Sequence, residues 1–527
     1  RFLCRQLRVI GTEKCVPSLA NLLTDPQLSH LARYALGRLQ VPAASEALLV
    51  ALDKTSGDLQ AGIIDTLGNR KCTAARGKLI ELLRSSDGIV AKAAAISLGR
   101  LGDSDSAAAL QEARSAASET QRVEIDNALL NAAEQLAANG RTREAAAIYQ
   151  DFYDSADTQQ MRFAGLRGLV TTQNEQAAQR LADAMRGDDV ASRRYAISLI
   201  GLVPGRQATE AWVVALGSLS VDDRVLLLRA LGVRGDGSAA EAIAKATKDD
   251  DPRVRMAALE ALGKVGDASS VLSLVQAAAA TDNMERNVAR AALRSLSAAD
   301  TKDRLLQLLD HAEVGIQVES IHALAARGAD DAVDALLRLA TAADTTVRRA
   351  AVEALGALAD QRQLDALVAL AATAETAEDQ EAWIEAIGKA FVRMGDQAKC
   401  ARAVLAELEK APKTARPALI RLLGKSASPE GLPAIRAALK AELPGLRQAA
   451  ARTLAEWPDA TVGGDLLALL TDRQHAESKE IVLEGYLRLA ALSDEPGSMY
   501  AQAMKRVHEV NDRKAVLEGL GLSAESP

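Results

Sequence analysis

A helix that ends in Leu-Gly or a close variant recurs along this 527-residue chain at a nearly constant interval. The interval is 31 residues in two separate blocks, whose anchor glycines are Gly37, Gly68, Gly99, Gly201, Gly232 and Gly263. Weaker anchors continue the series at Ala325, Gly356, Gly388, Gly424 and Ala455. A fixed period of roughly 20–50 residues is typical of arrays in which one small structural unit stacks on the next. The repeat therefore predicts one extended array, and not the three or four globular domains that the length alone suggests.

Each period contains two helical patterns. In the segment 344–360, DTTVRRAAVEALGALAD, the apolar residues Val347, Ala351 and Leu355 fall on one helix face. Asp344 precedes this run, where its carboxylate can cap the free N–H groups of the first turn. Two helices per period leave only short loops, so consecutive helices pack antiparallel and bury their apolar faces by stacking. The sequence predicts an all-α fold, an α-solenoid (superhelix) of about sixteen antiparallel helix pairs with a period near 31 residues.

Several of these segments carry a family resemblance. The clearest are 249–267, DDDPRVRMAALEALGKVGD, and 344–360, with weaker copies at 87–103 and 443–459. They resemble the HEAT-repeat family, and more closely the short bacterial HEAT-like repeats of the phycobilin-lyase type. The resemblance covers almost the whole chain and implies the solenoid fold, but it implies no particular activity.

Two segments depart from the regular pattern. The first has longer helices and is similar to a tetratricopeptide helix pair, and the second is rich in proline. We predict HEAT-like repeats over 1–121, a longer tetratricopeptide-like hairpin over 122–168, repeats over 169–410, and further repeats over 411–527 after a proline-rich joint. Because the apolar periodicity continues on both sides of each departure, we interpret both as joints within one solenoid.

Acidic and basic residues recur in one register of the repeat. The aspartates precede the Val347-type position by three residues, and the arginines follow it by one: Asp87, Asp189, Asp251, Asp344, Arg193, Arg224, Arg255, Arg348, Arg416 and Arg447. One interpretation is a basic stripe for an acidic partner. The other is a structural Asp–Arg ladder between adjacent repeats, of the kind that HEAT repeats carry. We favour the ladder because acid and base recur together, and its main role would be to set the register of the repeats.

Catalytic, metal and cofactor signatures are not found in the sequence. Some HEAT-like enzymes of the deoxyhypusine hydroxylase type hold two irons with paired His-Glu dipeptides, but only His508-Glu509 forms such a dipeptide here. His311 and His322 lack further ligands, and the four cysteines lack Cys-x-x-Cys spacing. Cys4 and Cys15 could pair in an oxidising compartment, although we favour small buried thiols. We therefore expect no catalytic residue, metal or cofactor in this chain.

The charge balance limits the partners. The 63 basic and 70 acidic residues give a net charge of −7, which argues against general nucleic-acid binding. No apolar stretch is long enough for membrane insertion. The leading hypothesis is a non-catalytic scaffold that binds a protein partner, or another domain of its own chain, along the concave face.

Two other functions stay open at this point. Residues 4–39 and the tetratricopeptide-like insert are similar to HEAT regions of large exported bacterial proteins that carry a 3-keto-disaccharide hydrolase-type or haem domain. That similarity implies a non-catalytic arm of such an enzyme, in a periplasmic or secreted location, whereas the chain would otherwise be cytoplasmic. The start at Arg1 instead of Met, and ends that lack polar caps, lead us to expect a segment of a longer polypeptide. The third hypothesis is an enzyme within the solenoid, either a lyase-like modifier or a DNA glycosylase.

Overall fold

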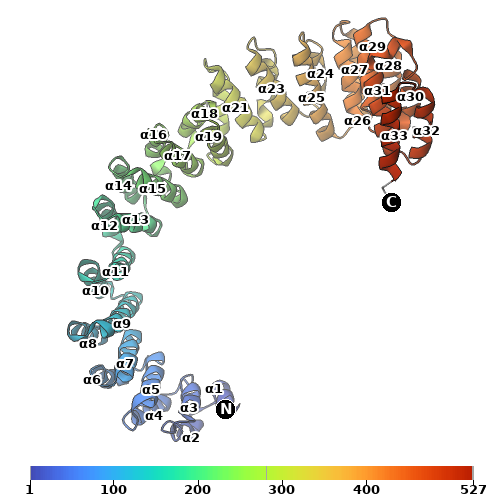
Figure 1. Cartoon of the computed structure of the whole chain (residues 1–527). Helices are drawn as coiled ribbons and strands as arrows, with labels where there is room; N and C mark the ends of the chain where they lie inside the picture. The colour runs from blue at the N-terminus through green and yellow to red at the C-terminus, as the bar shows by residue number, and fades with distance from the viewer. Residues whose placement is uncertain (1, 281, 525–527) are drawn as a thin grey trace. The chain divides into compact units, whose positions relative to one another are not determined.

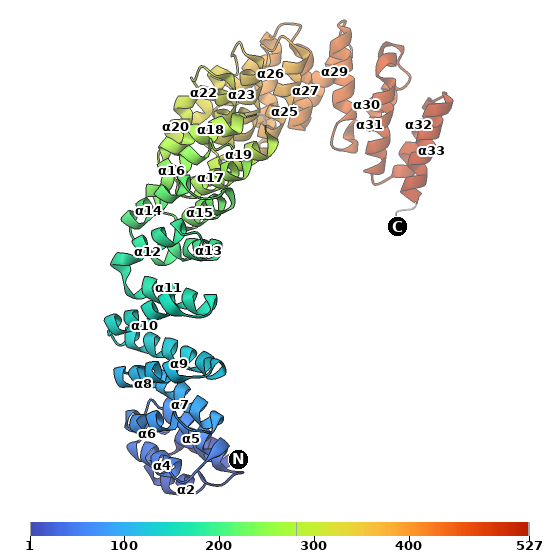
Figure 2. The same cartoon turned by 60° about the vertical axis from the view of Figure 1, so that its left-hand side comes forward.

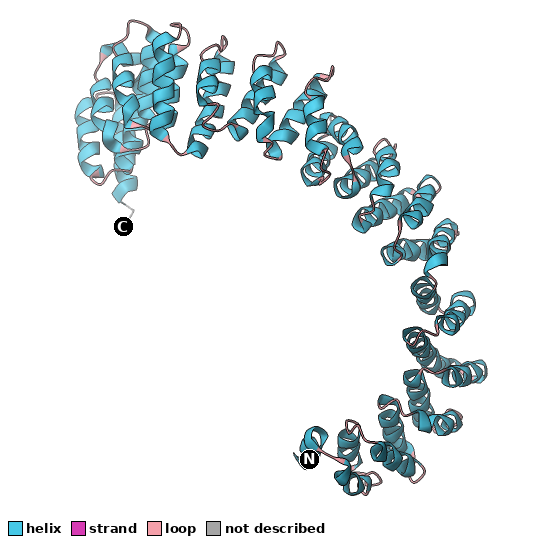
Figure 3. Cartoon of the chain, turned by 180° about the vertical axis from the view of Figure 1, so that it is seen from behind, coloured by secondary structure: helices cyan, strands magenta, loops and turns pink. Residues whose placement is uncertain are grey.

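The computed structural model describes residues 2–280 and 282–524, and Arg1, Thr281 and Glu525–Pro527 lie outside it. Within these two ranges the chain forms 33 α-helices joined by short turns and 3₁₀ segments, and no strand is present (Figure 3). The prediction of an all-α solenoid is confirmed. The chain divides into two compact parts between Ala242 and Ile243, here called the N-terminal part and the C-terminal part.

The N-terminal part is a stack of antiparallel helix pairs that follows α1 (Phe2–Ile10). The first helices of the pairs are α2 (Val16–Ala20), α4 (Pro42–Leu52), α6 (Arg76–Leu82), α8 (Ser104–Ala116), α10 (Thr142–Ser155), α12 (Asn174–Arg186) and α14 (Arg206–Val213). The second helices are α3 (Ser29–Leu36), α5 (Gly57–Asn69), α7 (Gly88–Leu101), α9 (Glu119–Ala138), α11 (Gln159–Thr172), α13 (Val190–Leu199) and α15 (Val221–Arg234). Figures 1 and 2 show the first helices in one row and the second helices in another.

The C-terminal part repeats this two-row arrangement beyond α16 (Ala240–Ala246), the helix in which the two parts divide. Its first helices are α18 (Val271–Ala279), α20 (Thr301–Leu308), α22 (Val333–Leu339), α24 (Leu364–Ala371), α26 (Gln397–Lys410), α28 (Leu432–Ala438), α30 (Gly463–Leu469) and α32 (Pro496–Arg506). Its second helices are α17 (Pro252–Val265), α19 (Asn283–Ser295), α21 (Val314–Ala326), α23 (Thr345–Leu358), α25 (Ala377–Met394), α27 (Arg416–Ser426), α29 (Pro444–Ala455), α31 (Lys479–Ala491) and α33 (Val510–Ala524).

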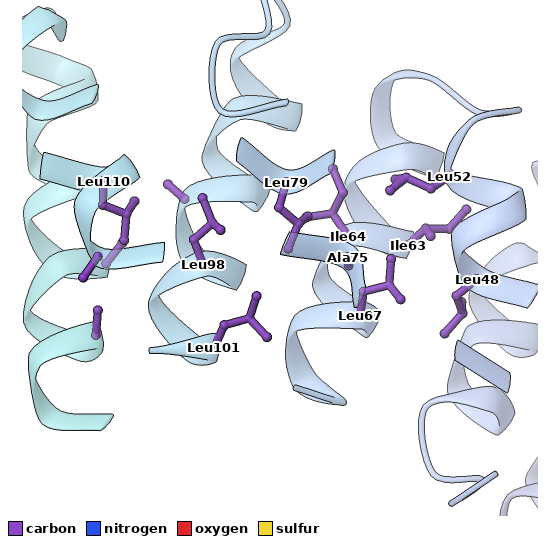
Figure 4. Close-up of a cluster of buried hydrophobic side chains, with 14 of the residues drawn as sticks. Leu48, Leu52, Ile63, Ile64, Leu67, Ala75, Leu79, Leu98, Leu101 and Leu110 are labelled. Atoms are coloured by element: carbon purple, nitrogen blue, oxygen red, sulfur yellow. The ribbon is translucent and has the colours of Figure 1, made fainter. Parts of the chain in front are cut away.

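The hydrophobic core runs continuously from one helix pair to the next. In Figure 4, Leu48 of α4, Ile64 of α5 and Leu79 of α6 lie between neighbouring helices, and Leu98 of α7 and Leu110 of α8 continue the same layer. All five side chains are fully buried. A single pair could not bury these faces alone, so each repeat depends on its neighbours for most of its stability.

At several anchor glycines, namely Gly68, Gly99, Gly263 and Gly356, consecutive second helices approach closely. A Cβ atom at Gly99 would lie 2.6 Å from the carbonyl oxygen of Ala128 in α9, and one at Gly356 would lie 2.8 Å from that of Ala386 in α25. Ordinary van der Waals contact begins near 3.4 Å. At these two positions a side chain would push the helices apart, which gives a physical reason for the Leu-Gly signature.

The two irregular segments are also helical. The first contains α9, the longest helix, which turns at Asn139 and Gly140 into α10. In the second, Pro417 and Pro433 occupy the first turns of α27 and α28, where a missing N–H removes no helical hydrogen bond. Whether the array bends at either segment stays a prediction.

Candidate functional site

The predicted aspartates all cap their own helices. Their carboxylates accept hydrogen bonds from backbone N–H groups in the first turns of α7, α13, α17 and α23, and the residues are Asp87, Asp189, Asp251 and Asp344. Asp344, for example, accepts from the N–H groups of Thr346 at 2.8 Å and Val347 at 3.1 Å. The hydrogen bond from Val347, followed by that from Thr346, lowers the pKa of Asp344 despite some burial. These carboxylates therefore satisfy N–H groups that a helix leaves free at its start.

Three of the predicted arginines reach across to the next repeat. Each is the fourth residue of its second helix, and it donates to a carboxylate that is the third residue of the following second helix. The pairs, here called rungs, are Arg193 Nε to Asp223 Oδ2 at 3.1 Å, Arg255 Nε to Glu285 Oε1 at 2.9 Å, and Arg348 Nη2 to Asp379 Oδ2 at 2.9 Å. The acids of these rungs are thus different residues from the predicted aspartates.

Each rung arginine also holds the loop before its own helix. Arg255 Nη1 donates to the carbonyl oxygens of Asp249 at 2.9 Å and Asp250 at 3.0 Å. The planar guanidinium therefore joins the start of one second helix, the preceding loop and the next repeat. Because these arginines already have partners, they are poorly placed to meet an external acidic partner. That the contacts set the register of the repeats stays a prediction.

The other predicted arginines differ. Arg224 is the fourth residue of α15, and Arg416 begins α27 and donates to the carbonyl oxygen of Ala411 at 3.2 Å. Arg447, the fourth residue of α29, donates to the carbonyl oxygens of Ala441 and Glu442, both at 2.9 Å.

Sequence reasoning missed a second set of arginines at the ends of second helices. They donate to carbonyl groups at the C-terminal end of the preceding second helix, and they are Arg70, Arg234, Arg327, Arg393 and Arg488. Arg327 Nη1, for example, lies 2.7 Å from Leu293 O and 2.9 Å from Leu296 O. Three of these arginines stand two residues after a repeat anchor, a spacing that would have identified them.

The second helices of the C-terminal part enclose a cavity of about 440 Å³. Residues from α19, α21 and α23 line it, with Leu293, Ala323 and Ala354 among the apolar residues. Polar side chains also line it, namely Arg290, Arg294, Glu319, His322 and Glu353. Apolar surface with a few polar groups around it is typical of a ligand or side-chain pocket.

A bidentate ion pair organises this cavity. Arg290 Nε lies 2.7 Å from Glu319 Oε2, and Arg290 Nη2 lies 2.6 Å from Glu319 Oε1. His322 Nδ1 lies 3.8 Å from Glu319 Oε1. Burial alone would raise the pKa of Glu319, but the interactions with His322 and Arg290 outweigh it and lower the pKa to about 2.

The arrangement suits recognition better than catalysis. Glu319 is ionised and paired, so it is a poor proton acceptor near neutral pH. None of the described residues that line the cavity is a serine, threonine, cysteine, lysine or tyrosine, the usual nucleophiles. The site has an apolar surface bordered by arginine and glutamate side chains that can form hydrogen bonds.

Two further cavities lie in the N-terminal part. One of about 680 Å³ is formed by α6, α7, α8 and α9, and the exposed ion pairs Arg84–Glu112 and Lys92–Glu124 lie at its edges. The other, of about 940 Å³, is a wide depression at the ends of α13 and α15. The first has only exposed ion pairs at its edges, and in the second the buried Arg234 already donates to backbone carbonyl groups, so the C-terminal cavity is the stronger candidate.

The structure also bears on metal ligands, on the cysteines and on membrane-spanning helices. Across residues 2–280 and 282–524, no group of three or more His, Cys, Asp or Glu side chains could hold a metal ion. Cys4 and Cys15 are both free thiols, and Cys15 Sγ donates to Thr12 O at 2.8 Å. In the same ranges, every helix is either too short or too polar to cross a bilayer.

Comparison with known proteins identifies the repeat. A family model described as HEAT repeats matches residues 45–129, 209–297, 303–388 and 401–485, which together make up more than half of the chain. A search of curated proteins with this chain found no match.

Several solved structures are similar. The CpcE–CpcF complex of phycocyanin lyase from Nostoc sp. is 25% identical, with a TM-score of 0.26, and the match covers 48% of this chain and 87% of that chain. Human deoxyhypusine hydroxylase is 21% identical, with a TM-score of 0.22 and coverage of 54% and 96%. The karyopherin Kap121p, bound to the SUMO protease Ulp1p, is 13% identical, with a TM-score of 0.36 and coverage of 97% and 74%.

Proposed function

Because the chain belongs to the HEAT-repeat family, we propose that it is a non-catalytic scaffold that binds a protein partner along its row of second helices. A solenoid of this family presents an extended surface on which each repeat contributes a few side chains. The observation that carries the proposal is the cavity between α19, α21 and α23, which opens on the second helices and has no serine, threonine, cysteine, lysine or tyrosine among its described lining residues.

The cavity favours an apolar anchor residue on the partner. Ala323 and Ala354 are buried, while Ala326 and Ala357 are exposed, and these small side chains leave room for a large one. Anchors that fill such pockets, surrounded by polar groups, contribute most of the affinity in many protein interfaces. His322 lines the same cavity and can form a hydrogen bond with a polar atom next to the apolar anchor.

The partner is either a separate protein or an adjoining domain of a longer chain. The hypothesis of an arm of an exported enzyme rests on the similarity of residues 4–39 and stays a prediction. We disfavour an enzyme within the solenoid. The ion pair with Arg290 keeps Glu319 ionised, so this carboxylate is a poor proton acceptor for catalysis.

A cavity-filling substitution tests the proposal. Ala357→Trp places a large side chain in the cavity from an exposed position, whereas Ala366→Trp makes the same change at an exposed position of α24, outside the cavity residues. We expect proteins captured from the natural source by the parent chain to be lost with Ala357→Trp and retained with Ala366→Trp. Circular dichroism establishes that both variants are folded. If both variants capture the same proteins as the parent, the cavity is not the binding site.

A further inference from the structure

The rungs between repeats place a buried carboxylate beside each arginine. The exposed fractions of the acids are 0% for Asp223, 7% for Glu285 and 9% for Asp379. Each acid stands three residues after the residue that caps its helix, namely Ser220, Asp282 and Thr376. The cap and the acid therefore form a fixed local pattern at the start of the helix.

Arg447 has the same position in α29 as the rung arginines, but none of the carboxylates in residues 2–280 and 282–524 pairs with it. It keeps the two carbonyl contacts of a rung arginine, to Ala441 and Glu442. Its Nε atom is buried and has no hydrogen-bond partner in the described part of the chain. A buried donor without a partner costs about 1–3 kcal/mol, so this nitrogen requires an explanation.

In the next repeat a histidine stands three residues after the capping residue, where the rungs have an acid. The short 3₁₀ helix η10 (Arg473–Ser478) precedes α31, Asp472 caps it, and His475 is its third residue. His475 is only 5% exposed. Where the acid is missing after other arginines at this helix position, the third residue is apolar: Val254 follows Arg224, and Ile316 follows Arg286. Among these repeats, Arg447 is followed by a buried histidine, where Arg224 and Arg286 are followed by an apolar residue.

His475 also presents an unpartnered nitrogen. Its Nδ1 atom lies 3.1 Å from Asp472 Oδ2, so this nitrogen carries a proton that Asp472 accepts. Its Nε2 atom is buried and has no partner among the described residues. The backbone of η10 departs from helical geometry at this residue, with φ −111° and ψ 16°, which sets the ring apart from an ordinary helical side chain.

Arg447 and His475 both line a cavity of about 240 Å³. Gln448, Arg473, Gln474 and Ser478 are among the other polar residues of its wall. Two acids lie nearby, and both already have partners: Asp472 accepts from His475 and from the N–H of Gln474, and the exposed Glu477 accepts from Gln448 Nε2 at 2.6 Å. The cavity thus has two arginines and a histidine facing it, with two buried nitrogens that lack an acceptor.

We propose that this pocket binds a carboxylate from outside the chain, the side chain of an Asp or Glu on the protein partner. Arg447 Nε–H donates to one oxygen and the doubly protonated ring of His475 donates from Nε2–H to the other, while Asp472 accepts from Nδ1–H and keeps the ring oriented. Toward Arg447, the external carboxylate has the role that Asp223, Glu285 and Asp379 have toward the arginines of the rungs. This inference rests on the proposed scaffold function, because it assumes a protein partner that supplies the acid.

A carboxylate fits better than a phosphate. The same arginine position carries a carboxylate in three rungs, and the guanidinium geometry toward Asp or Glu is therefore already built into the repeat. Asp472 and Glu477 also border the site, and their negative charges disfavour a dianion more than a monoanion.

The test uses a small probe on the full chain. Glutamate blocked at both ends carries a single carboxylate, and blocked glutamine is its neutral counterpart. We expect blocked glutamate to shift the ring signal of His475 saturably in histidine-labelled protein, and blocked glutamine to leave it unchanged. His475→Gln assigns the signal among the five histidines.

Two substitutions in α29 make the test specific. Arg447→Met removes the donor and should weaken probe binding at least about tenfold. Arg452→Met removes another arginine of the same helix, which pairs with Glu456 at 2.9 Å, and should leave binding unchanged. A second readout is thermal: blocked glutamate should raise the midpoint of unfolding of the parent and of Arg452→Met, but not of Arg447→Met.

The outcomes separate the pocket from the scaffold proposal. An absent or unsaturable response to blocked glutamate, an equal response to blocked glutamine, stronger binding of inorganic phosphate, or binding that survives Arg447→Met would each overturn the carboxylate assignment while leaving the scaffold function standing. Probe binding together with partner capture that ignores Ala357→Trp would instead support the pocket and overturn the cavity proposed for the partner.

Discussion

The anchor glycines give the sharpest test of how the repeats pack. In Gly356→Ala, the new Cβ atom would meet the backbone of α25, at 2.8 Å from Ala386 O and 2.9 Å from Ala386 Cα. Gly388 occupies the next anchor position in the same part of the chain, but its nearest atoms are the side-chain carbons of Lys425 at 3.3–3.5 Å. Gly388→Ala is therefore a control with the same chemical change and a neighbour that can move.

The expected cost follows from these distances. Ordinary contact begins near 3.4 Å, so α23 and α25 would have to separate by about 0.6 Å at Gly356. Overpacking of this kind costs about 1–3 kcal/mol, and the better helix propensity of alanine returns up to about 1 kcal/mol. We expect Gly356→Ala to lower the free energy of unfolding by about 1–2 kcal/mol, and Gly388→Ala to leave it unchanged or slightly raised.

Urea unfolding followed by circular dichroism at 222 nm measures the difference. Because neighbouring repeats are coupled, Gly356→Ala should also broaden the transition of the C-terminal part if local opening begins between α23 and α25. If Gly356→Ala proves as stable as Gly388→Ala, close approach of the second helices is not the reason for glycine at the anchors.

Two further substitutions test the arginines. Arg327→Met removes the donor to Leu293 O and Leu296 O, and it should lower the free energy of unfolding by about 2 kcal/mol in urea titrations; a neutral result would mean that water satisfies these carbonyls equally well. Because the pKa of Glu319 falls from 4.5 to about 2, its contribution to stability is present above about pH 4.5 and is lost as the pH falls towards 2. This contribution is at most about 3 kcal/mol, so Arg290→Met should be less stable than the parent at pH 7, with the difference shrinking towards pH 2 in urea titrations at stepped pH. A difference that does not depend on pH would show that the ion pair is not its source.

The repeat and its helices could be predicted from the sequence because their causes are local. The spacing of apolar residues in a segment such as 344–360 predicts which face is buried, and the capping residue Asp344 predicts where the helix begins. Gly356 is in contact with the next repeat, and because similar contacts recur at Gly68, Gly99 and Gly263, the Leu-Gly signature is visible in the sequence even though the neighbouring repeat is not.

The ladder shows where sequence reasoning stops. Spacing places Asp251 and Arg255 in one register, yet Arg255 donates to Glu285. The carboxylate of Asp251 instead accepts from the N–H groups of its own helix, and Glu285, the third residue of the next second helix, faces the previous repeat. The pattern of a cap followed three residues later by an acid, as in Asp282 and Glu285, resembles a capping box and could have suggested this partner. The offset between adjacent repeats, which decides the contact, depends on packing and not on spacing.

Repetition makes departures informative. Within an array, neighbouring repeats act as internal references: the guanidinium at this helix position meets a carboxylate in three rungs, and none of the described carboxylates pairs with it at Arg447. Arg447 keeps the loop contacts of its counterparts, and His475 is held by Asp472, so both side chains are ordered without the missing acceptor. Two ordered and buried nitrogens without a hydrogen-bond partner, one of them on a guanidinium, form a preformed half of a binding site. Glu477 at the cavity and Asp472 beside it already accept hydrogen bonds, which is why we assign the carboxylate that completes the site to the partner.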